Sequence, residues 1–144
     1  HIEGRILHNP KFPISGGKAN FKVCPIPAVR KNSQNRFILM TVRSEGQFNT
    51  VVYDTNDRYR GISGRNVVLM NKSDMTTLGL LENNKVTIKN QTGVMTGQKA
   101  IAYPIKEGNI MMYYPESNVL VPRKSDPQSK TPSFKSIEVF LEKE

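Results

Sequence analysis

The residues of this sequence best suited to chemistry lie between Thr41 and Gly64. Arginines in this run (Arg43, Arg58 and Arg60) alternate with small hydrogen-bonding side chains, aromatic rings and glycines. An arginine offers a planar fork of donors that matches phosphate geometry, and glycine lets the backbone approach a ligand closely. Amide and hydroxyl groups can bond a heterocycle without adding charge. The run is therefore typical of a site for a phosphate-bearing ligand, although a solvated basic loop beside a strand would have the same composition.

Residues for nucleophilic, acid–base or metal chemistry are sparse. The two histidines, His1 and His8, both precede the body of the chain, and the carboxylates are scattered. The single cysteine, Cys24, excludes an internal disulfide and a cysteine-cluster metal site, and it is more typical of a small buried hydrophobe than of a nucleophile. The segment from Gly93 to Lys99 misses the spacing of a phosphate-binding P-loop. We therefore expect no catalytic residue and no metal ligand in this chain.

Composition narrows the class of protein and of ligand. A chain of 144 residues with 37% hydrophobic and 23% charged residues suits one globular domain with a real core. The net charge of +9 indicates an anionic partner, which could be nucleic acid, a phosphorylated cofactor or an acidic protein surface. We find no apolar run long enough for a membrane helix and no signal peptide, so we expect a cytoplasmic location.

The chain divides into segments of different character. Residues 1–5 resemble the remnant of a protease-cleaved tag, and residues 6–30 are spaced by proline and glycine as in an arm or linker. The body, residues 31–144, contains several short runs with strand composition and one short helix. The expected strands are 37–42, 67–70, 85–89, 98–105, 108–114 and 136–142, with a further short strand at 21–24.

The pattern of these elements predicts the fold class. The helix is expected at 73–79, with Ser73 as N-cap and Gly79 as its C-terminal stop. Many short strands with frequent turn signals favour a small β-barrel or a sandwich. The expected core is apolar and alternates along the strands: Ile38, Met40, Val67, Leu69, Val86, Ile88, Ile101, Met112, Val139 and Leu141.

Two segments near the C-terminus share the polar and basic character of the opening run. The first spans residues 113–121 and carries Ser117 and Asn118, and the second spans 130–135 and places Phe134 beside Lys135. Taken alone, each segment also fits a simple turn or a basic loop. These two segments support a binding site only if they lie beside the run from Thr41 to Gly64 in the fold.

Taken together, these segments resemble, in order and spacing, the C-terminal domain of the molybdopterin-dependent oxidoreductases, in particular the formate-dehydrogenase-like branch. The resemblance covers about Gly16 to Glu142. It rests on GGKANF, TVRSEGQFNT, DRYRGI, VVLMNKSDMTTLGL, YYPESNVLVP and SKTPSFKSIEV. It implies a mainly β fold, a double-psi β-barrel of the aspartate-decarboxylase-like type with one or two short helices.

The resemblance also implies a cofactor, bis(molybdopterin guanine dinucleotide) carrying molybdenum or tungsten, over which this domain closes from one side. Arg43 and Lys135 would neutralise pyrophosphate charge while amides read the heterocycles. Many relatives carry histidine where this chain has Gln47. The residues that match the family's cofactor-binding positions are Arg43, Ser44, Gln47, Asn49, Thr50, Asn118, Phe134 and Lys135, with Arg58 and Arg60 from a segment typical of one branch.

In this family the iron–sulfur cysteines, the metal ligand and the acid–base residues lie upstream. The resemblance therefore implies a domain that is inactive alone and whose partners are the cofactor and the upstream catalytic domains of the same polypeptide. One alternative is a stand-alone cofactor-binding subunit of the formylmethanofuran-dehydrogenase type. Another is a basic β-barrel that binds single-stranded nucleic acid, which is less favoured because the basic residues coincide with the family motifs and no RNA-binding signature is present.

Overall fold

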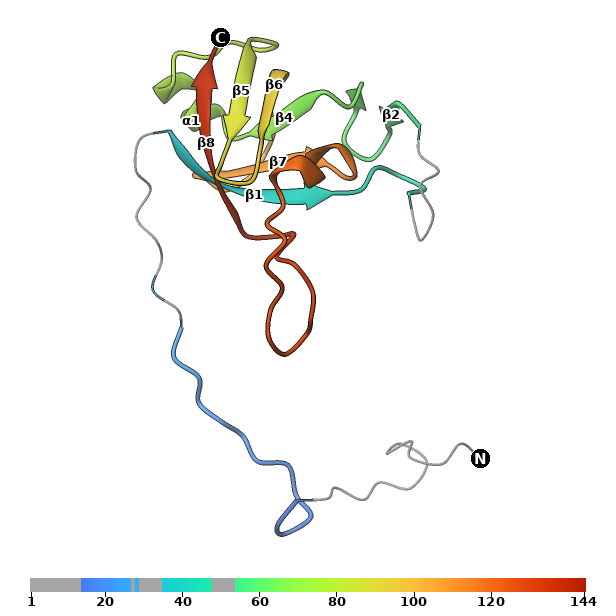
Figure 1. Cartoon of the computed structure of the whole chain (residues 1–144), viewed down its shortest axis with the longest axis vertical. Helices are drawn as coiled ribbons and strands as arrows, with labels where there is room; N and C mark the ends of the chain where they lie inside the picture. Colours follow the sequence, from blue (N-terminus) through green and yellow to red (C-terminus); the bar gives the residue numbers. More distant parts are fainter. Residues whose placement is uncertain (1–13, 27, 29–34, 48–53) are drawn as a thin grey trace. The chain divides into compact units, whose positions relative to one another are not determined.

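The computed structural model describes residues 14–26, 28, 35–47 and 54–144. The chain separates into compact units, His1–Arg30 and Lys31–Glu144. All regular secondary structure of the described residues lies in the second unit (Figure 1). The tag-like residues 1–5 lie outside the described residues, and the extent of the arm and of the barrel domain stays a prediction.

The described residues of the first unit contradict two expectations. No strand forms at 21–24, where Phe21 and Val23 are fully exposed. Cys24 is a free and exposed cysteine, not a buried one. A strand needs a partner for its backbone groups and an apolar face needs a surface to cover it, and these described residues find neither within their unit. The short apolar run alone was not sufficient to form a strand.

The described residues of the second unit form short strands and two short helices. Six strands belong to a closed barrel, a two-stranded hairpin is separate, and the helices follow β4 and β7. Their bounds are β1 Arg36–Val42, β2 Asn56–Asp57, β3 Ile62–Ser63, β4 Val67–Met70, α1 Lys72–Thr77, β5 Lys85–Lys89, β6 Val94–Ala102, β7 Asn109–Tyr113, η2 Glu116–Leu120 and β8 Ile137–Lys143. The strand expected at 98–105 thus begins and ends earlier along the chain, and the β2–β3 hairpin was not predicted.

The barrel closes in the order β1-β7-β4-β6-β5-β8. The pairs β1–β7 and β4–β6 are parallel, and the other four pairs are antiparallel. Exchanging β1 with β6, β4 with β7 and β5 with β8 reproduces every one of these pairings. The barrel is therefore two equivalent halves, β1-β4-α1-β5 and β6-β7-η2-β8, whose strands interlock. The predicted mainly β fold, the double-psi β-barrel and its short helices are confirmed.

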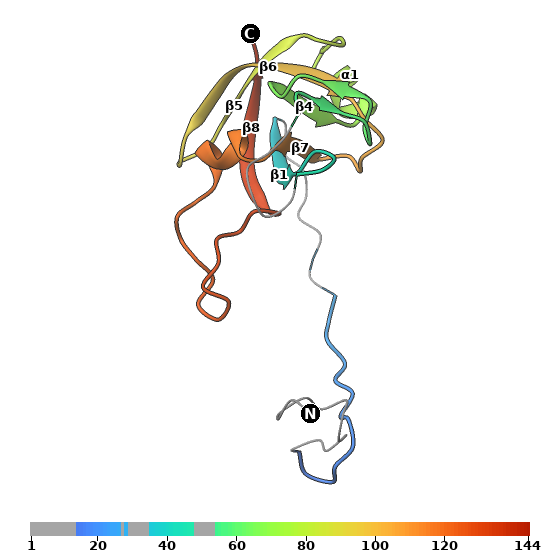
Figure 2. The same ribbon diagram turned by 90° about the vertical axis from the view of Figure 1, so that its right-hand side faces the viewer.

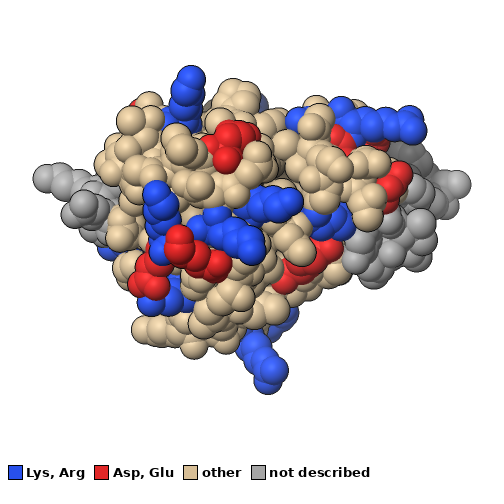
Figure 3. Space-filling view, turned by 90° about the horizontal axis from the view of Figure 1, so that it is seen from above, with Lys and Arg blue, Asp and Glu red and all other residues tan. Residues whose placement is uncertain are grey.

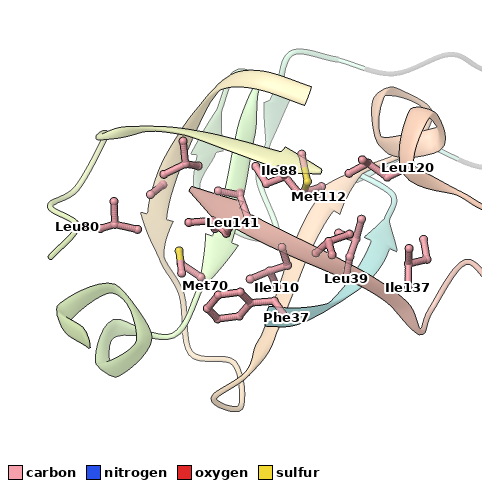
Figure 4. Close-up of a cluster of buried hydrophobic side chains, with 14 of the residues drawn as sticks. Phe37, Leu39, Met70, Leu80, Ile88, Ile110, Met112, Leu120, Ile137 and Leu141 are labelled. Atoms are coloured by element: carbon pink, nitrogen blue, oxygen red, sulfur yellow. The ribbon is translucent and has the colours of Figure 1, made fainter. Parts of the chain in front are cut away.

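The interior of the barrel is apolar, and its register corrects the expected core. On β1, Phe37 and Leu39 belong to the main cluster of buried apolar side chains inside the barrel (Figure 4). Ile38 and Met40, on the other face of the strand, are only half-buried. The run from Phe37 to Val42 carries almost no polar marker, so its sequence could not show which alternate residues face inward. Ile101 is also half-buried. The other expected core residues are buried.

A second, smaller apolar cluster lies apart from the main one. Val67, Leu69 and Tyr113 form its buried centre, and Ile62 of the β2–β3 hairpin packs against it. All four residues of β4 are buried, because alternate side chains of this strand belong to the two different clusters. The long connection between β1 and β4 is thereby fixed to the barrel.

The helix α1 begins earlier than expected. Its N-cap is Asn71, whose side-chain oxygen accepts a hydrogen bond of 2.7 Å from the amide of Ser73. Ser73 therefore lies within the first turn and does not cap it. The carboxylate of Asp74 accepts from the amide of Gly108 at 2.8 Å, which joins the helix to the turn before β7. Gly79, with φ of 62°, ends the segment as predicted.

The two ends of the barrel differ in the segments and the charges that they carry. Residues 121–136 extend away from the strands on the side opposite the C-terminus, as both orientations show (Figures 1 and 2). The end that carries the C-terminus mixes basic and acidic side chains on its surface (Figure 3). Although the sequence carries an excess of positive charge, the surface at the C-terminal end is therefore not purely basic.

Candidate functional site

The strand pairing explains why segments distant in sequence meet at one edge of the barrel. β1 runs parallel to β7 and antiparallel to β8. The C-terminal ends of β1 and β7 and the N-terminal end of β8 therefore lie together. Arg43 follows β1, Tyr114 follows β7, and Lys135 precedes β8. The topology thus brings the first predicted loop and the last one to the same place.

An open pocket of about 470 Å³ lies at this edge and is lined by Thr41, Arg43, Tyr114, Phe134 and Lys135. The guanidinium carbon of Arg43 lies 5.4 Å from the centroid of the Tyr114 ring. The amide of Thr41 donates to the carbonyl of Phe134 at 3.0 Å, and the Lys135 ammonium donates to the carbonyl of Thr41. The pocket therefore combines two cations with two aromatic rings on a fixed backbone frame.

The electrostatics of this pocket favour an anion. Burial lowers the pKa of Lys135, and the nearby positive charges of Arg43 and Arg60 lower it further. Within the described part of the chain, neither Arg43 nor Lys135 forms a salt bridge with a carboxylate. A bound anion would relieve the repulsion between the two cations and would accept several charge-assisted hydrogen bonds.

Two of the predicted site residues are engaged inside the protein. The side-chain oxygen of Gln47 accepts from the amide and the hydroxyl of Ser44 at 3.2 and 3.3 Å. Its amide nitrogen donates to the carbonyl of Tyr114 at 2.9 Å. Both side chains are buried. Ser44 and Gln47 therefore join the loop after β1 to the segment after β7, and neither lines the pocket.

The predicted arginines divide into different roles. Arg43 is exposed and lines the pocket. Arg58 is exposed. Backbone hydrogen bonds from Asn56 and Thr55 lower the pKa of Asp54, and the positive charge of Arg58 makes a smaller contribution in the same direction. Arg60 forms a salt bridge of 2.5 Å with Asp57 and donates to the carbonyl of Arg43 at 3.1 Å. Arg60 therefore supports the backbone that carries Arg43.

Asp57 is the centre of a buried polar group beside the pocket. Its carboxylate accepts from Arg60 and from the hydroxyl of Tyr113 at 2.8 Å. Burial by itself raises the pKa of Asp57, but these hydrogen bonds and the Arg60 charge hold it below its usual value. Burial and the bond to Asp57 raise the pKa of Tyr113. The group holds the β2–β3 hairpin against the end of β7.

The remaining predicted residues are distributed differently. Asn118 is exposed on η2 and is not among the residues that line the pocket. Asn49 and Thr50 lie outside the described residues. The structure therefore brings Arg43, Phe134 and Lys135 together at the pocket, and Asn118 is not part of its lining. The cofactor-contact role of each of these residues stays a prediction.

Sequence reasoning missed several residues that build the site. Thr41 and Tyr114 line the pocket although neither was proposed as a ligand contact. Arg65 was overlooked because it falls just beyond the run that ends at Gly64, and its main partner, Glu116, lies 51 positions away. An aromatic pair next to a proline, as at Tyr114, was the one local signal available for this wall of the pocket.

No other chemical centre emerges from the described residues. Among them, no group of three or more His, Cys, Asp or Glu side chains could hold a metal ion. In the same part of the chain, every helix is too short or too polar to cross a membrane.

Comparison with known proteins identifies the family. Residues 37–138 match the family described as Molydopterin dinucleotide binding domain. An uncharacterized oxidoreductase of Mycobacterium tuberculosis strain H37Rv is 40% identical over 153 residues, which cover 96% of this chain and 20% of the relative. Protein YdeP of Escherichia coli K12 is 34% identical, over 92% of this chain and 19% of that protein.

A solved structure shares the fold. Acetylene hydratase from Pelobacter acetylenicus superposes with a TM-score of 0.54 at 14% identity, over 73% of this chain and 18% of that one. The chain spans about one fifth of the length of the curated relatives that it matches. It belongs to the family of molybdopterin dinucleotide-binding domains, and it corresponds to a fragment of larger proteins that include named oxidoreductases.

Proposed function

We propose that this chain is the C-terminal cofactor-binding barrel of a formate-dehydrogenase-like oxidoreductase, that it binds bis(molybdopterin guanine dinucleotide), and that it is inactive alone. The observation that supports this proposal best is the pocket at the end of β1. Its cations, Arg43 and Lys135, and its aromatic walls, Tyr114 and Phe134, come from the segments that match the family. Upstream domains of the same polypeptide would supply the metal ligand, the iron–sulfur cluster and the acid–base residues.

The residues present suit part of such a dinucleotide. A pyrophosphate carries negative charge and many acceptor oxygens, and Arg43 and Lys135 supply donors and positive charge without a carboxylate partner among the described residues. An ammonium group has three donors, and Lys135 uses one of them on the carbonyl of Thr41, so others can reach a phosphate. The ring of Tyr114 or Phe134 can stack on a planar heterocycle.

In this proposal the chain's residues bind and orient, and the cofactor supplies two-electron redox chemistry when bound. Arg43 and Lys135 neutralise phosphate, and Phe134 shields one side of the pocket. Arg58, Asn49, Thr50 and Asn118 are proposed as further contacts around this centre. Ser44, Gln47 and Arg60 contribute by holding the loop that presents Arg43.

A titration with guanosine diphosphate (GDP), followed by NMR of the backbone amides, tests this proposal. We expect shifts concentrated at Arg43, Tyr114, Phe134 and Lys135. The variants Arg43→Gln and Lys135→Gln should each weaken binding about tenfold, which is the loss of one charge-assisted contact. Lys89→Gln serves as a control because Lys89 is a half-buried lysine on β5, paired with Glu142 and outside the pocket.

Two further ligands make the result specific. Inorganic pyrophosphate should shift Arg43 and Lys135 without the aromatic residues, whereas purified molybdopterin guanine dinucleotide should bind more tightly than GDP. The absence of shifts at this edge with the purified cofactor would exclude the proposed site. Binding of single-stranded oligonucleotides with a steep salt dependence, in place of nucleotide binding, would support the nucleic-acid alternative.

The finer assignments belong to this proposal as well. The guanine form of the cofactor, a metal that is molybdenum or tungsten, and the formate-type reaction are inferred from the resemblance of the motifs, and a cytoplasmic location is proposed with them. A stand-alone subunit of the formylmethanofuran-dehydrogenase type would use the same pocket. The gene sequence upstream of Ile6 distinguishes the two, because only the first reading requires catalytic domains in the same polypeptide.

A further inference from the structure

We propose that Arg65 is a positioning residue that sets the distance between two of the segments that line the pocket, the loop after β1 and the segment after β7, and that it does not itself bind the ligand. This inference rests on the proposed function for the identity of the ligand. Arg65 lies two positions before β4, and its side chain is only 8% exposed. It does not line the pocket. Its guanidinium instead contacts two segments that do, the loop after β1 and the segment after β7.

The contacts of Arg65 are numerous and point in different directions. Toward the segment after β7, it binds both carboxylate oxygens of Glu116, at 2.5 and 3.0 Å, and the carbonyl of Tyr114 at 2.6 Å. Toward the loop after β1, it donates to the hydroxyl of Ser44 at 3.1 Å. Its guanidinium carbon lies 4.8 Å from the centroid of the Tyr113 ring. One rigid group thus spans both loops.

The same two loops are also joined by Gln47, so the connection forms a closed circuit. The carbonyl of Tyr114 accepts from Arg65 and from Gln47. Ser44 bonds both of these residues in turn. A circuit of this kind fixes the backbone of residues 43–47 relative to Tyr114, because moving either loop breaks several hydrogen bonds at once. The walls of the pocket, Arg43 and Tyr114, are carried on that backbone.

The physical benefit of this arrangement is preorganisation. Arg43 and Tyr114 would otherwise have to be ordered when a ligand binds, and ordering each such side chain opposes association. Because Arg65 holds the loops in the free protein, the loss of conformational entropy occurs during folding and no longer opposes ligand binding. Glu116 neutralises the Arg65 charge in a bidentate pair, so Arg65 keeps its position without an anion in the pocket.

The competing interpretation is that Arg65 exchanges Glu116 for a ligand phosphate. The two interpretations predict opposite signs for Glu116→Gln. If Arg65 positions the loops, removing its charged partner loosens them, and GDP binding weakens. If Arg65 is a ligand contact that Glu116 restrains, the same substitution frees it, and GDP binding strengthens.

The experiment compares Glu116→Gln, Arg65→Lys and Ser44→Ala with wild type, with Arg36→Gln as the matched control. Arg36 forms another arginine–glutamate pair, with Glu138, and lies outside the pocket. We expect Arg65→Lys and Glu116→Gln each to weaken GDP binding about tenfold, since lysine cannot bridge both loops. Ser44→Ala, which removes one hydroxyl, should give a smaller loss. Arg36→Gln should leave the affinity unchanged.

Further readouts separate positioning from ligand contact and from loss of folding. In the free protein, the amides of Ser44 and Gln47 should shift in Arg65→Lys and Glu116→Gln, while the amides of β5 and β8 stay in place in these two variants. Arg36→Gln should leave the amides of Ser44 and Gln47 unchanged. The salt dependence of GDP binding should not change in Arg65→Lys, because the charges that face the ligand are the same. Unaltered Ser44 and Gln47 amides, or an affinity equal to that of wild type, would overturn the proposal, and so would tighter binding by Glu116→Gln.

The two proposals fail in different ways. If wild type shows no GDP-dependent shifts at Arg43 and Lys135, the proposed function loses its support. The amide shifts of the free variants still decide whether Arg65 holds the loops together. If wild type binds GDP and Arg65→Lys binds it equally well, the proposed function stands and the role of Arg65 is refuted.

Discussion

The substitution Asp57→Asn should destabilise the barrel strongly, although Asp57 lies in a two-residue strand on the periphery. The side chain of Asp57 is 2% exposed. One of its oxygens accepts from Arg60 at 2.5 Å and from the hydroxyl of Tyr113 at 2.8 Å. The other accepts from the amide of Tyr59 at 3.1 Å. An asparagine keeps the shape but loses the charge and one acceptor oxygen.

The expected cost follows from these contacts. A hydrogen bond to a charged group contributes roughly 1.5–3 kcal/mol, and Asp57 makes two of them through side chains. The side chain of Arg60 is 20% exposed, so part of its charge is hydrated once the partner is lost, and the cost stays below the full sum. We therefore expect a loss of about 2–4 kcal/mol in the free energy of unfolding.

Urea unfolding of the wild type, Asp57→Asn, Tyr113→Phe and the double variant measures this. Tyr113→Phe alone should cost about 1–2 kcal/mol, and its cost should fall by roughly 1 kcal/mol in the Asp57→Asn background, because the shared hydrogen bond is already lost. The urea concentration at the midpoint of unfolding should fall, while the slope of the unfolding free energy against urea concentration stays unchanged. A loss below about 1 kcal/mol for Asp57→Asn, or strictly additive effects, would refute the assigned network.

The pH dependence provides an independent check on Asp57. Its pKa in the folded protein lies below 3.8, the ordinary value of an aspartate, because hydrogen bonds from Arg60 and Tyr113 and the Arg60 charge outweigh the effect of burial. A carboxyl of this kind binds fewer protons in the folded state, so its stabilisation is complete above pH 3.8 and is lost as the pH falls through the folded pKa. Asp57→Asn should remove this part of the acid destabilisation. An equal dependence on pH in both proteins, below about pH 4, would contradict the assignment.

The remaining predictions concern packing. Leu39→Ala should cost about 3 kcal/mol of unfolding free energy and Ile38→Ala clearly less, because Leu39 is fully buried and Ile38 is not; equal losses would contradict the observed register. Gly93→Ala should cost about 2–3 kcal/mol, because its Cβ would lie 2.5 Å from the carbonyl oxygen of Val119. Gly61→Ala should cost only about 1 kcal/mol, since its Cβ meets nothing within 4 Å and the cost arises from φ of 65°. Urea unfolding measures the free-energy losses in both pairs of variants. A larger loss for Gly61→Ala than for Gly93→Ala would contradict the close contact assigned to Gly93.

Much of the barrel could be predicted from the sequence because its strands carry local signals. The alternation of Val86 and Ile88 with polar residues identified both β5 and its inward face. The run from Phe37 to Val42 identified β1 but not its register, since apolar residues occupy both faces. The N-cap of α1 was misplaced because Asn71 and Ser73 are both good caps. The side chain of Asn71 also donates to the carbonyl of Ile105 at 2.6 Å, a contact far along the chain that the local sequence does not reveal.

The site was predictable only in part, for a related reason. An arginine faces a ligand or the protein according to whether a carboxylate lies near it in space. Asp57 is three positions from Arg60, so their salt bridge was visible as a possibility in the sequence. Glu116 is 51 positions from Arg65, and no local pattern connects them. Arg43 differs because no carboxylate among the described residues pairs with it.

The symmetry of the barrel creates a second edge equivalent to the one that carries this pocket, and the two edges differ in chemistry. The equivalent edge joins the C-terminal ends of β6 and β4 to the N-terminal end of β5. Its backbone repeats the first edge, since Ala100 donates to the carbonyl of Asn84 as Thr41 does to that of Phe134. Its chemistry is opposite, because Glu82 places there a carboxylate that accepts from the amide of Ala102 at 3.1 Å.

The connections that leave the two edges account for this difference. After β6 the chain reaches β7 through residues 103–108, whereas after β1 it reaches β4 through residues 43–66. The longer connection supplies Arg43 to the pocket and carries Ser44, Gln47, Asp57, Arg60 and Arg65, which hold it in place. The barrel itself supplies two equivalent frames. We therefore attribute the proposed anion-binding character of one of them to that longer connection and to Lys135, and we expect changes confined to these segments to alter ligand binding while leaving the strand pairing intact.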